Sequence, residues 1–563
     1  MNETTLLVGR SKSDITFSTK SVAMFGWADT RNTIKGVETP LYCRAVVLKE
    51  ADSSKKIVMV NIEYCMISQA LYLGIIRKLK ADHPELEVTE QNLQVSANHT
   101  HSAPSGYCHY PIYNLPTPGY CKEIYNFLVD AIVKAVVSAH QSFVPGVVKY
   151  HYGAFAEDIP VAFNRSIIPY VANPDAERIP YGHRHKAIDR NMYLLRVEGE
   201  DGKPLASLNW FGVHCTSVKN TNNLISSDNK GWAAKLHEES INQNGDNPDF
   251  ISLFMQSTGA DVSPNYKLYF GLRGYRGAFR DMFESKNFNG KLQADQAIKL
   301  FDEASQKTPL KAQIGYLTKY NDLTNIEAMP EFSFGKAGAK TGDPALGIFL
   351  MKGANGEGSG IPGFIIFLIK MLSRLLTKNL SKVHGEKDIF IDCKRRTVFG
   401  IKRLYLLPVP NFVEMYVRSV KFFTKIASKV DFPFYHTHNP IQIFSIGNFA
   451  ILGLPGEPTT TQGRRLRKST LPQLAKLGIK NLVIAGYCNS YHGYITTYEE
   501  YQKQNYEGGH TVYGMWTGAA YQTLAIELSK QFVDEKTEKV ELPTTVVPSS
   551  LERFMWSDFY PNL

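Results

Sequence analysis

Short runs of apolar and β-branched residues alternate along the chain with longer stretches in which apolar residues recur every three or four positions. The runs predict β-strands, and the stretches predict helices with one apolar face. The predicted strands cover residues 43–48, 57–64, 92–98, 147–155, 192–198, 207–214, 251–257, 445–457 and 481–489. The predicted helices cover residues 68–82, 122–139 and 232–243. This succession predicts an α/β fold with a large mixed layered sheet and flanking helices.

The pattern changes between residues 343 and 431. Residues 360–383 contain a Gly/Pro break followed by an apolar helix whose other side is basic, and residues 411–430 repeat this style. Basic amphipathic helices bind anionic membrane surfaces, with the apolar face sunk among the headgroups. The alternative is that both helices pack their apolar faces on the protein. We therefore predict one body, residues 1–342 and 432–563, interrupted by a basic, amphipathic helical insert at 343–431 that docks on membranes.

The distribution of charge supports this division. The 563 residues carry a formal net charge of +10. Residues 370–429 alone hold fourteen Lys and Arg against four Asp and Glu, so the rest of the chain is neutral overall. A protein that binds nucleic acid through diffuse charge would spread it more widely, and we predict no nucleic-acid partner.

Composition and targeting signals narrow the class further. At 43% hydrophobic and 21% charged residues the chain is predicted to be globular, and seven scattered cysteines without a CxxC motif indicate neither a disulfide framework nor a cysteine zinc site. The chain has no run of 18 uncharged apolar residues, so no transmembrane helix is predicted. The first residues lack the apolar core of a secretory signal, which predicts a cytoplasmic or peripheral membrane protein, or a secreted or periplasmic one if the N-terminus was trimmed.

Histidines stand at the ends of two predicted strands. His99 and His101, in NHTHSAPSG, share a face if the strand before them persists, as two metal ligands would. His214 ends the strand SLNWFGVH before a polar loop. The alternative for the His99/His101 pair is a polar loop that happens to hold two histidines, and the alternative for His214 is a histidine satisfied within the core. Two further HxH pairs, His183/His185 and His436/His438, are predicted to lie in surface loops.

Two other residues are candidates for chemistry. Glu457 follows an apolar strand and a Pro-Gly turn, a poor place for an idle charge, and catalytic zinc sites use three or four N/O ligands. Ser263, in GADVSPN, lies on a turn after a strand, although a serine nucleophile needs a base within reach. The segment 491–509 holds five tyrosines, which alone would indicate packing.

Taken together these strings resemble the neutral ceramidase family, the zinc-dependent N-acylsphingosine amidohydrolases. The resemblance rests on NHTHSAPSG, FNRS, NWFGVHCTSVKNTNNLISSDNKG, GADVSPN, LPGEPTTTQGRRLR and YITTYEEYQKQNYEGG, in family order up to about Thr517. It implies that the body is a catalytic domain that binds one Zn²⁺ per chain. The implied zinc ligands are His99, His214, Glu457 and Tyr494.

The resemblance also implies catalytic roles for four residues. His101 would transfer a proton, Arg165 and Tyr506 would surround the scissile amide, and Ser263 matches the serine held to be essential. We expect zinc-activated water to be the nucleophile and Ser263 to position a partner, while a serine acyl-enzyme stays open. The implied reaction splits ceramide or a related N-acyl lipid into a fatty acid and a long-chain amine.

Several departures from the family pattern keep alternatives open. About 45 residues follow Thr517, too few for the immunoglobulin-like domain of ~100 residues that family members often carry. The family's GDVSPN has an extra alanine here, Ala260, and the insert is unusually cationic. The alternatives are reverse N-acylation, hydrolysis of a different N-acyl amide, and a lipid-binding relative without turnover. A phosphoesterase would need a second metal, for which Asp228 and Asp261 are the nearby candidates.

Overall fold

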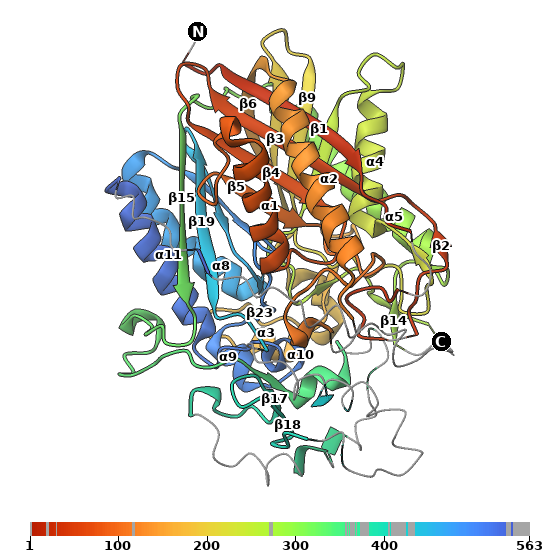
Figure 1. Cartoon of the computed structure of the whole chain (residues 1–563), viewed down its shortest axis with the longest axis vertical. Coiled ribbons are helices and arrows are strands. Elements are labelled where there is room, and N and C mark those ends of the chain that lie inside the picture. The colour runs from red at the N-terminus through yellow and green to blue at the C-terminus, as the bar shows by residue number, and fades with distance from the viewer. Residues whose placement is uncertain are drawn as a thin grey trace.

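Two mixed β-sheets pack face to face, and helices cover the outer face of each (Figure 1). The computed structural model describes most of the chain. The described residues are 3–18, 22–29, 31–114, 119–269, 274–354, 357, 360, 366–367, 369–371, 382–403, 406, 421, 424–425, 434–535 and 542–543. The larger sheet has eight strands and the smaller has four.

The strands of the larger sheet come from the first half of the chain. Their order is β11 (Ile251–Met255), β9 (Pro204–Trp210), β8 (Asn191–Gly199), β6 (Val144–Ala154), β1 (Leu6–Asp14), β3 (Tyr42–Glu50), β4 (Lys56–Ile62), β5 (Leu93–Ala97). The outermost pairs, β4 with β5 and β9 with β11, are parallel, and the other pairs are antiparallel. The predicted large mixed sheet is therefore confirmed.

The smaller sheet comes from the second half of the chain. Its order is β15 (Ile314–Asp322), β19 (His438–Ile446), β20 (Phe449–Gly453), β22 (Asn481–Ala485). The single strand predicted at 445–457 is wrong, because β19 and β20 form a hairpin. The turn passes through Gly447, whose φ of 53° suits a residue without a side chain.

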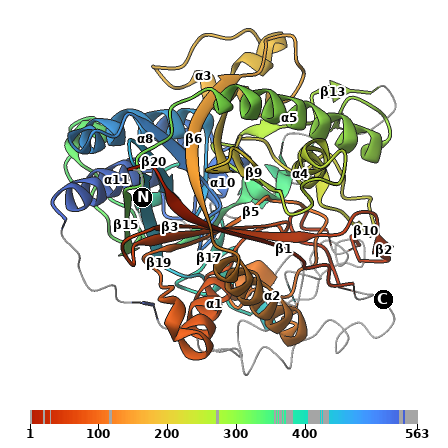
Figure 2. The same cartoon turned by 90° about the horizontal axis from the view of Figure 1, so that it is seen from above.

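Alternating side chains explain why the sheets are layered. On β3 and β4, Val46 and Met59 face the smaller sheet, while Val47 and Val58 face the helices. Both faces of these strands are apolar because both are covered. On the outer faces, α1 (Gln69–Asp82), α2 (Lys122–Gln141), α4 (Asp228–Ile241) and α5 (Met282–Ser305) cover the larger sheet, and α8 (Thr460–Leu474) and α11 (Thr517–Val533) cover the smaller one (Figure 2).

Short elements connect this framework to the loops at one end of the sheets. They are α3 (Ile167–Val171), α9 (Tyr498–Gln502), α10 (Tyr506–Gly509) and the strand pairs β7 (Phe163–Asn164) with β12 (Val262–Ser263), β21 (Glu457–Pro458) with β23 (Tyr494–Ile495), β2 (Gly36–Val37) with β10 (Leu224–Ile225), and β13 (Lys267–Leu268) with β14 (Tyr275–Arg276). The pairing of β21 with β23 joins Glu457 to Tyr494 across the two strands.

The segment 343–431 is tied to the body where the structure describes it. Strands β16 (Ala345–Gly347), β17 (Ile389–Asp392) and β18 (Thr397–Val398) form a small sheet, and Ala345 N–H donates to Val512 O at 2.9 Å. Most of the two predicted amphipathic helices, at 360–383 and 411–430, lies outside the described residues.

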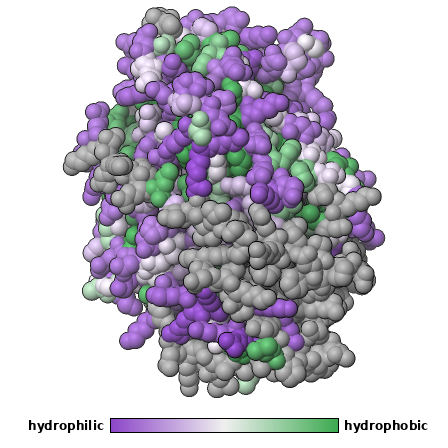
Figure 3. Space-filling view, viewed as in Figure 1, coloured by the Kyte–Doolittle hydropathy of each residue, from purple (hydrophilic) through white to green (hydrophobic). Residues whose placement is uncertain are grey.

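The surface of the described residues carries no large apolar patch on the face drawn in Figure 3. On the face drawn in Figure 3, their hydrophobic side chains lie scattered among hydrophilic ones, as is usual for a protein surface. Within the described part of the chain, no helix is both long and apolar enough to cross a lipid bilayer.

Candidate metal centre and active site

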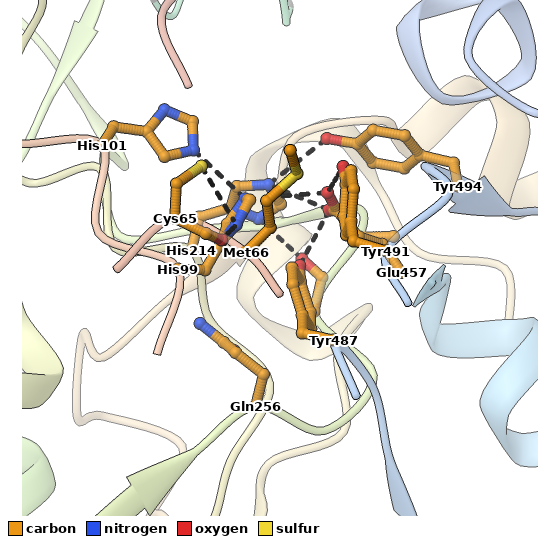
Figure 4. Close-up of polar contacts among 12 residues, drawn as sticks. Cys65, Met66, His99, His101, His214, Gln256, Glu457, Tyr487, Tyr491 and Tyr494 are labelled. Atoms are coloured by element: carbon orange, nitrogen blue, oxygen red, sulfur yellow. Dashed lines mark hydrogen bonds and ion pairs between the residues drawn. The ribbon is translucent and has the colours of Figure 1, made fainter. Parts of the chain in front are cut away.

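Loops from both sheets meet at the carboxyl ends of the parallel strand pairs. His99 follows β5, His214 follows β9, and Glu457 follows β20, so residues far apart in sequence point at one buried position (Figure 4). Carboxyl ends of parallel strands are a general place for ligand sites in α/β proteins. The three predicted residues are thus brought together.

Backbone carbonyl groups set the orientation of both histidines. His99 Nδ1 lies 2.6 Å from Cys65 O, and His214 Nδ1 lies 2.8 Å from Gly259 O. A carbonyl only accepts, so each Nδ1 carries the proton and each Nε2 keeps its lone pair for the centre. Burial lowers the pKa of His99 to about 4, which keeps this imidazole neutral at physiological pH.

Glu457 lies opposite the two histidines. Its Oε2 accepts a hydrogen bond from Tyr487 at 2.8 Å, and its Oε1 accepts one from Tyr491. Burial alone would raise the pKa of Glu457, but the hydrogen bond from Tyr491 helps to hold it well below its usual range. The carboxyl group is therefore a carboxylate in a site from which water is excluded.

Gln256 holds the two histidine loops in register. Its side-chain amide donates to Asn98 O at 2.8 Å and to Val213 O at 2.6 Å, and these residues immediately precede His99 and His214. Such outer contacts are what fix ligand orientation in metal sites. This role could not be predicted, because Gln256 is a single amide at the end of an apolar strand.

The spacing of the polar atoms suits a metal ion. His99 Nε2 lies 3.6 Å from Glu457 Oε1, and His214 Nε2 lies 3.4 Å from Glu457 Oε2 and 3.4 Å from the Tyr494 hydroxyl. Tetrahedral bonds of ~2.1 Å to zinc separate neighbouring ligand atoms by roughly 3.4 Å. Two imidazoles, a carboxylate and a phenol therefore fit Zn²⁺ in both donor chemistry and spacing.

Cys65 also lies beside His99 and His101, and these three groups are within metal-binding distance of one another. Burial raises the pKa of the Cys65 thiol well above its usual value. The N/O group around His214 also has the Tyr494 hydroxyl, 3.4 Å from His214 Nε2, so it offers four donors, whereas the group with Cys65 has three.

His101 reaches the centre without the strand geometry predicted for it. β5 ends at Ala97, and His99 takes a left-handed conformation (φ 75°), so the HxH pair does not share a strand face. A turn brings the rings together instead, with the two Nε2 atoms 3.1 Å apart. Burial lowers the pKa of His101 well below its usual value, so it too is neutral.

Arg165 joins the centre to a second group of polar residues. Its guanidinium donates to the Tyr494 hydroxyl at 3.1 Å and to Ala260 O at 2.8 Å, and forms ion pairs with Glu507 at 3.0 Å and Glu357 at 3.1 Å. The additional alanine of GADVSPN thus supplies the carbonyl that holds this guanidinium. Tyr506 is half-buried beside it, with its ring 5.5 Å from the Arg165 Cζ.

Ser263 is completely buried next to Glu357. The Ser263 hydroxyl donates to Glu357 Oε1, and Asn265 N–H donates to Ser263 Oγ at 2.9 Å. Burial would raise the pKa of Glu357, but Lys219, Arg165 and the hydrogen bonds from Ser263 and Asn265 lower it overall. A carboxylate with a lowered pKa is a weak base, so this contact favours a positioning role for Ser263 over a nucleophilic one.

Glu357, Glu507, Tyr487 and Tyr491 are site residues that sequence reasoning missed as individuals. Glu357 comes from the segment 343–431 and is 3% exposed, so the described part of that segment contributes to the site. The cluster of tyrosines at 491–509 was the one available signal, and Tyr491 from it contacts Glu457.

The remaining predicted histidines and aspartates lie elsewhere. His183 is exposed and His185 is partly exposed, as predicted. The prediction for His436 is wrong: it is buried, and its ring is held by the Tyr113 hydroxyl at 2.9 Å, whereas His438 is exposed. Among the described residues, neither Asp228 nor Asp261 belongs to a group that could hold a metal.

Comparison with known proteins supports the same conclusion. A family model described as neutral/alkaline non-lysosomal ceramidase, N-terminal, matches residues 6–399 and 418–523. The neutral ceramidase of Pseudomonas aeruginosa is 31% identical over 528 residues, which cover 92% of this chain and 71% of that protein. Neutral ceramidase A of Dictyostelium discoideum is 31% identical over 563 residues, covering 94% and 72%.

Solved structures agree with the sequence matches. A structure described as ceramidase complexed with C2 superposes with a TM-score of 0.78 and 30% identity, over 97% of this chain and 78% of that one. The crystal structure of neutral ceramidase from Pseudomonas aeruginosa gives a TM-score of 0.76 and 28% identity, over 98% and 78%.

Fold and site together define a mixed α/β hydrolase with a buried candidate metal centre. The family match extends over most of the chain and includes every residue of that centre. The chain belongs to the neutral/alkaline non-lysosomal ceramidase family.

Proposed function

We propose that this ceramidase-family hydrolase cleaves the amide bond of ceramide, or of a related N-acyl lipid, to a fatty acid and a long-chain amine with one bound zinc ion. The observation that carries the proposal is the convergence of His99 Nε2, His214 Nε2 and the Glu457 carboxylate, beside the Tyr494 hydroxyl. Zn²⁺ bound there would polarise the amide carbonyl and lower the pKa of a water molecule toward ~7.

His101 is placed to move the proton that this reaction requires. As a neutral imidazole, its ring has one nitrogen free to accept a proton from the attacking water close to His99. The same nitrogen can then donate that proton to the leaving amine, which is the usual sequence of general base and acid catalysis. This role explains why His101 is buried beside His99 although it is not one of the four candidate zinc ligands.

Arg165 brings positive charge to the Tyr494 hydroxyl, and the Tyr506 ring lies beside both Arg165 and Tyr494. An amide becomes negatively charged at oxygen when it is attacked, and each preorganised donor to that oxygen contributes about 3 kcal/mol. Glu357 and Glu507 fix the guanidinium from two sides, so little reorganisation is needed during the reaction. Ser263 supports this arrangement through Glu357.

The insert supports docking on an anionic membrane. Phe367, Met371 and Leu406, from its described part, expose 61%, 53% and 61% of their surface, and residues 370–429 hold the chain's whole excess of positive charge. Exposed apolar groups among basic ones suit the interface of an anionic bilayer. A lipid substrate would then pass from the membrane to the site without crossing water.

The experiment that tests the proposal follows both products by mass spectrometry. The purified protein, stripped of metal and reloaded with zinc, is incubated with N-acylsphingosine and, in a second reaction, with sphingosine and free fatty acid. Release of equal amounts of fatty acid and sphingosine supports hydrolysis. Turnover that appears only as acylation of sphingosine by free fatty acid would favour the reverse reaction. Failure to bind zinc or to turn over either substrate would favour a lipid-binding relative.

A further inference from the structure

A buried lysine next to the candidate active site lacks a directly bonded acceptor within the described part of the chain. Lys219, in the loop between β9 and α4, is 2% exposed. Its Nζ has no hydrogen-bond partner, and no ion pair joins it to any of the described residues. Lysine is almost never buried without a partner, because its ammonium loses hydration that nothing replaces. An unpaired buried cation therefore calls for an explanation.

The charge of Glu357 acts on Lys219, but the Lys219 ammonium is hydrogen-bonded to neither of its carboxylate oxygens. Its Oε1 accepts hydrogen bonds from Ser263 and Asn265, and its Oε2 pairs with Arg165. Burial lowers the pKa of Lys219 to about 8; Glu357 and Asp228 oppose this shift, and Arg276 and Arg165 add to it. The ammonium is still mostly protonated at neutral pH.

Trp27 offers a second unused donor at the same place. The Lys219 ammonium lies over the Trp27 ring, 5.4 Å from its centre, in a cation–π contact that supplies no hydrogen-bond acceptor. The indole Nε1 is buried and, like the lysine, has no hydrogen-bond partner within the described chain. The two loops are joined to each other, because the Asn220 side chain donates to Asp29 Oδ2 at 3.1 Å. Two donors without an acceptor form a site that suits an anion.

This pair of donors borders His101. The Trp27 and His101 rings meet edge to face, with centres 5.0 Å apart. The backbone at Gly26 packs so closely that a side chain there would lie 2.4 Å from His101 Cγ. In the proposed mechanism His101 protonates the leaving nitrogen, so Lys219 and Trp27 lie on the amine side of the amide.

We propose that Lys219 and the indole N–H of Trp27 form a subsite for an anionic group, a phosphate ester or a sulfonate, carried by the amine part of the N-acyl lipid. The inference rests on the proposed function, since that function defines which side of the amide they face. A tetrahedral oxyanion would accept hydrogen bonds from both donors and neutralise the ammonium. The subsite would direct the enzyme toward N-acyl amines with an acidic headgroup.

The test compares two soluble substrates that differ only in this charge: N-hexanoyl-sphingosine and its 1-phosphate. The readout is the ratio of their kcat/KM values, phosphate over uncharged. We expect Lys219→Met to lower this ratio at least tenfold, Trp27→Phe to lower it a few-fold, and Lys219→Arg to retain most of it. Lys134→Met, which removes an exposed lysine of α2, is the matched control and should leave the ratio at the wild-type value.

The outcomes separate this inference from the proposed function. If the wild-type protein cleaves N-hexanoyl-sphingosine but Lys219→Met leaves the ratio unchanged while remaining folded by thermal melting, the subsite is refuted. If Lys219→Met instead weakens inhibition by hexanoate without changing the ratio, the lysine binds the fatty acid product and the headgroup assignment is wrong. If the wild-type protein cleaves neither substrate, the proposed function itself fails.

Discussion

Replacing Glu357 by glutamine tests whether the segment 343–431 completes the site. The wild-type carboxylate accepts two hydrogen bonds at Oε1 and an ion pair at Oε2. Glutamine retains one acceptor oxygen, but its amide nitrogen would face a donor of Arg165. Hydrogen bonds to a charged group are each worth about 1.5–3 kcal/mol, and breaking a buried ion pair costs about 3–5 kcal/mol.

We expect Glu357→Gln to lower the free energy of unfolding by about 2–4 kcal/mol. The loss falls below that of a fully broken pair, because Arg165 keeps its second partner, Glu507, at 3.0 Å. Urea unfolding at pH 7, followed by tryptophan fluorescence, measures this difference. The matched control is Glu386→Gln, an exposed glutamate of the same segment, which should change stability by less than ~0.5 kcal/mol.

The pH dependence gives an independent check. The pKa of Glu357 is lowered in the folded protein, so its stabilisation is complete above the unfolded value of ~4.3 and is lost as the pH falls below it. The difference between wild type and Glu357→Gln should therefore stay constant near neutral pH and shrink below about pH 4. Equal stability of Glu357→Gln and Glu386→Gln at pH 7 would refute the placement of Glu357 and the role assigned to Ser263.

Three further predictions follow from the site and the insert. His101→Ala should keep bound zinc but lose about 10²–10⁴-fold in kcat; loss of the metal would make His101 a ligand. Tyr491→Phe should weaken zinc affinity about 10–100-fold in a chelator competition, since it removes a hydrogen bond that orients Glu457; unchanged affinity would contradict this. Replacing Arg374 and Lys378 by Gln should weaken binding to anionic vesicles by about 2 kcal/mol and leave binding to neutral vesicles unchanged. If the variant binds anionic vesicles as tightly as the wild type does, membrane docking by the insert is contradicted.

The core strands and helices could be predicted because their apolar residues are periodic. The runs at 57–64 and 92–98 became β4 and β5, and the stretch at 68–82 became α1, which begins after its N-cap Ser68. The helices α5, α8 and α11 were not predicted. The hairpin of β19 and β20 was missed because the turn at Gly447 interrupts a run that looks continuous.

The candidate site was predictable only where its residues stand in long, unusual strings. His99, His214 and Glu457 lie in such strings, and the structure brings them together. Glu357 lies in a glycine-rich stretch, and Lys219 in a polar loop; neither has a periodic pattern around it. Glu357 matters because it contacts Ser263, more than ninety residues away, and Lys219 matters because its ammonium has no hydrogen-bond partner among the described residues. Only the three-dimensional arrangement reveals either fact.

The most direct test of the account measures zinc content and fatty acid release on the same sample of protein. N-acylsphingosine is the substrate, and wild type is compared with His99→Ala. The account predicts about one zinc per wild-type chain with release of fatty acid, and loss of both in His99→Ala. Full turnover by His99→Ala, or by wild-type protein free of metal, would contradict it.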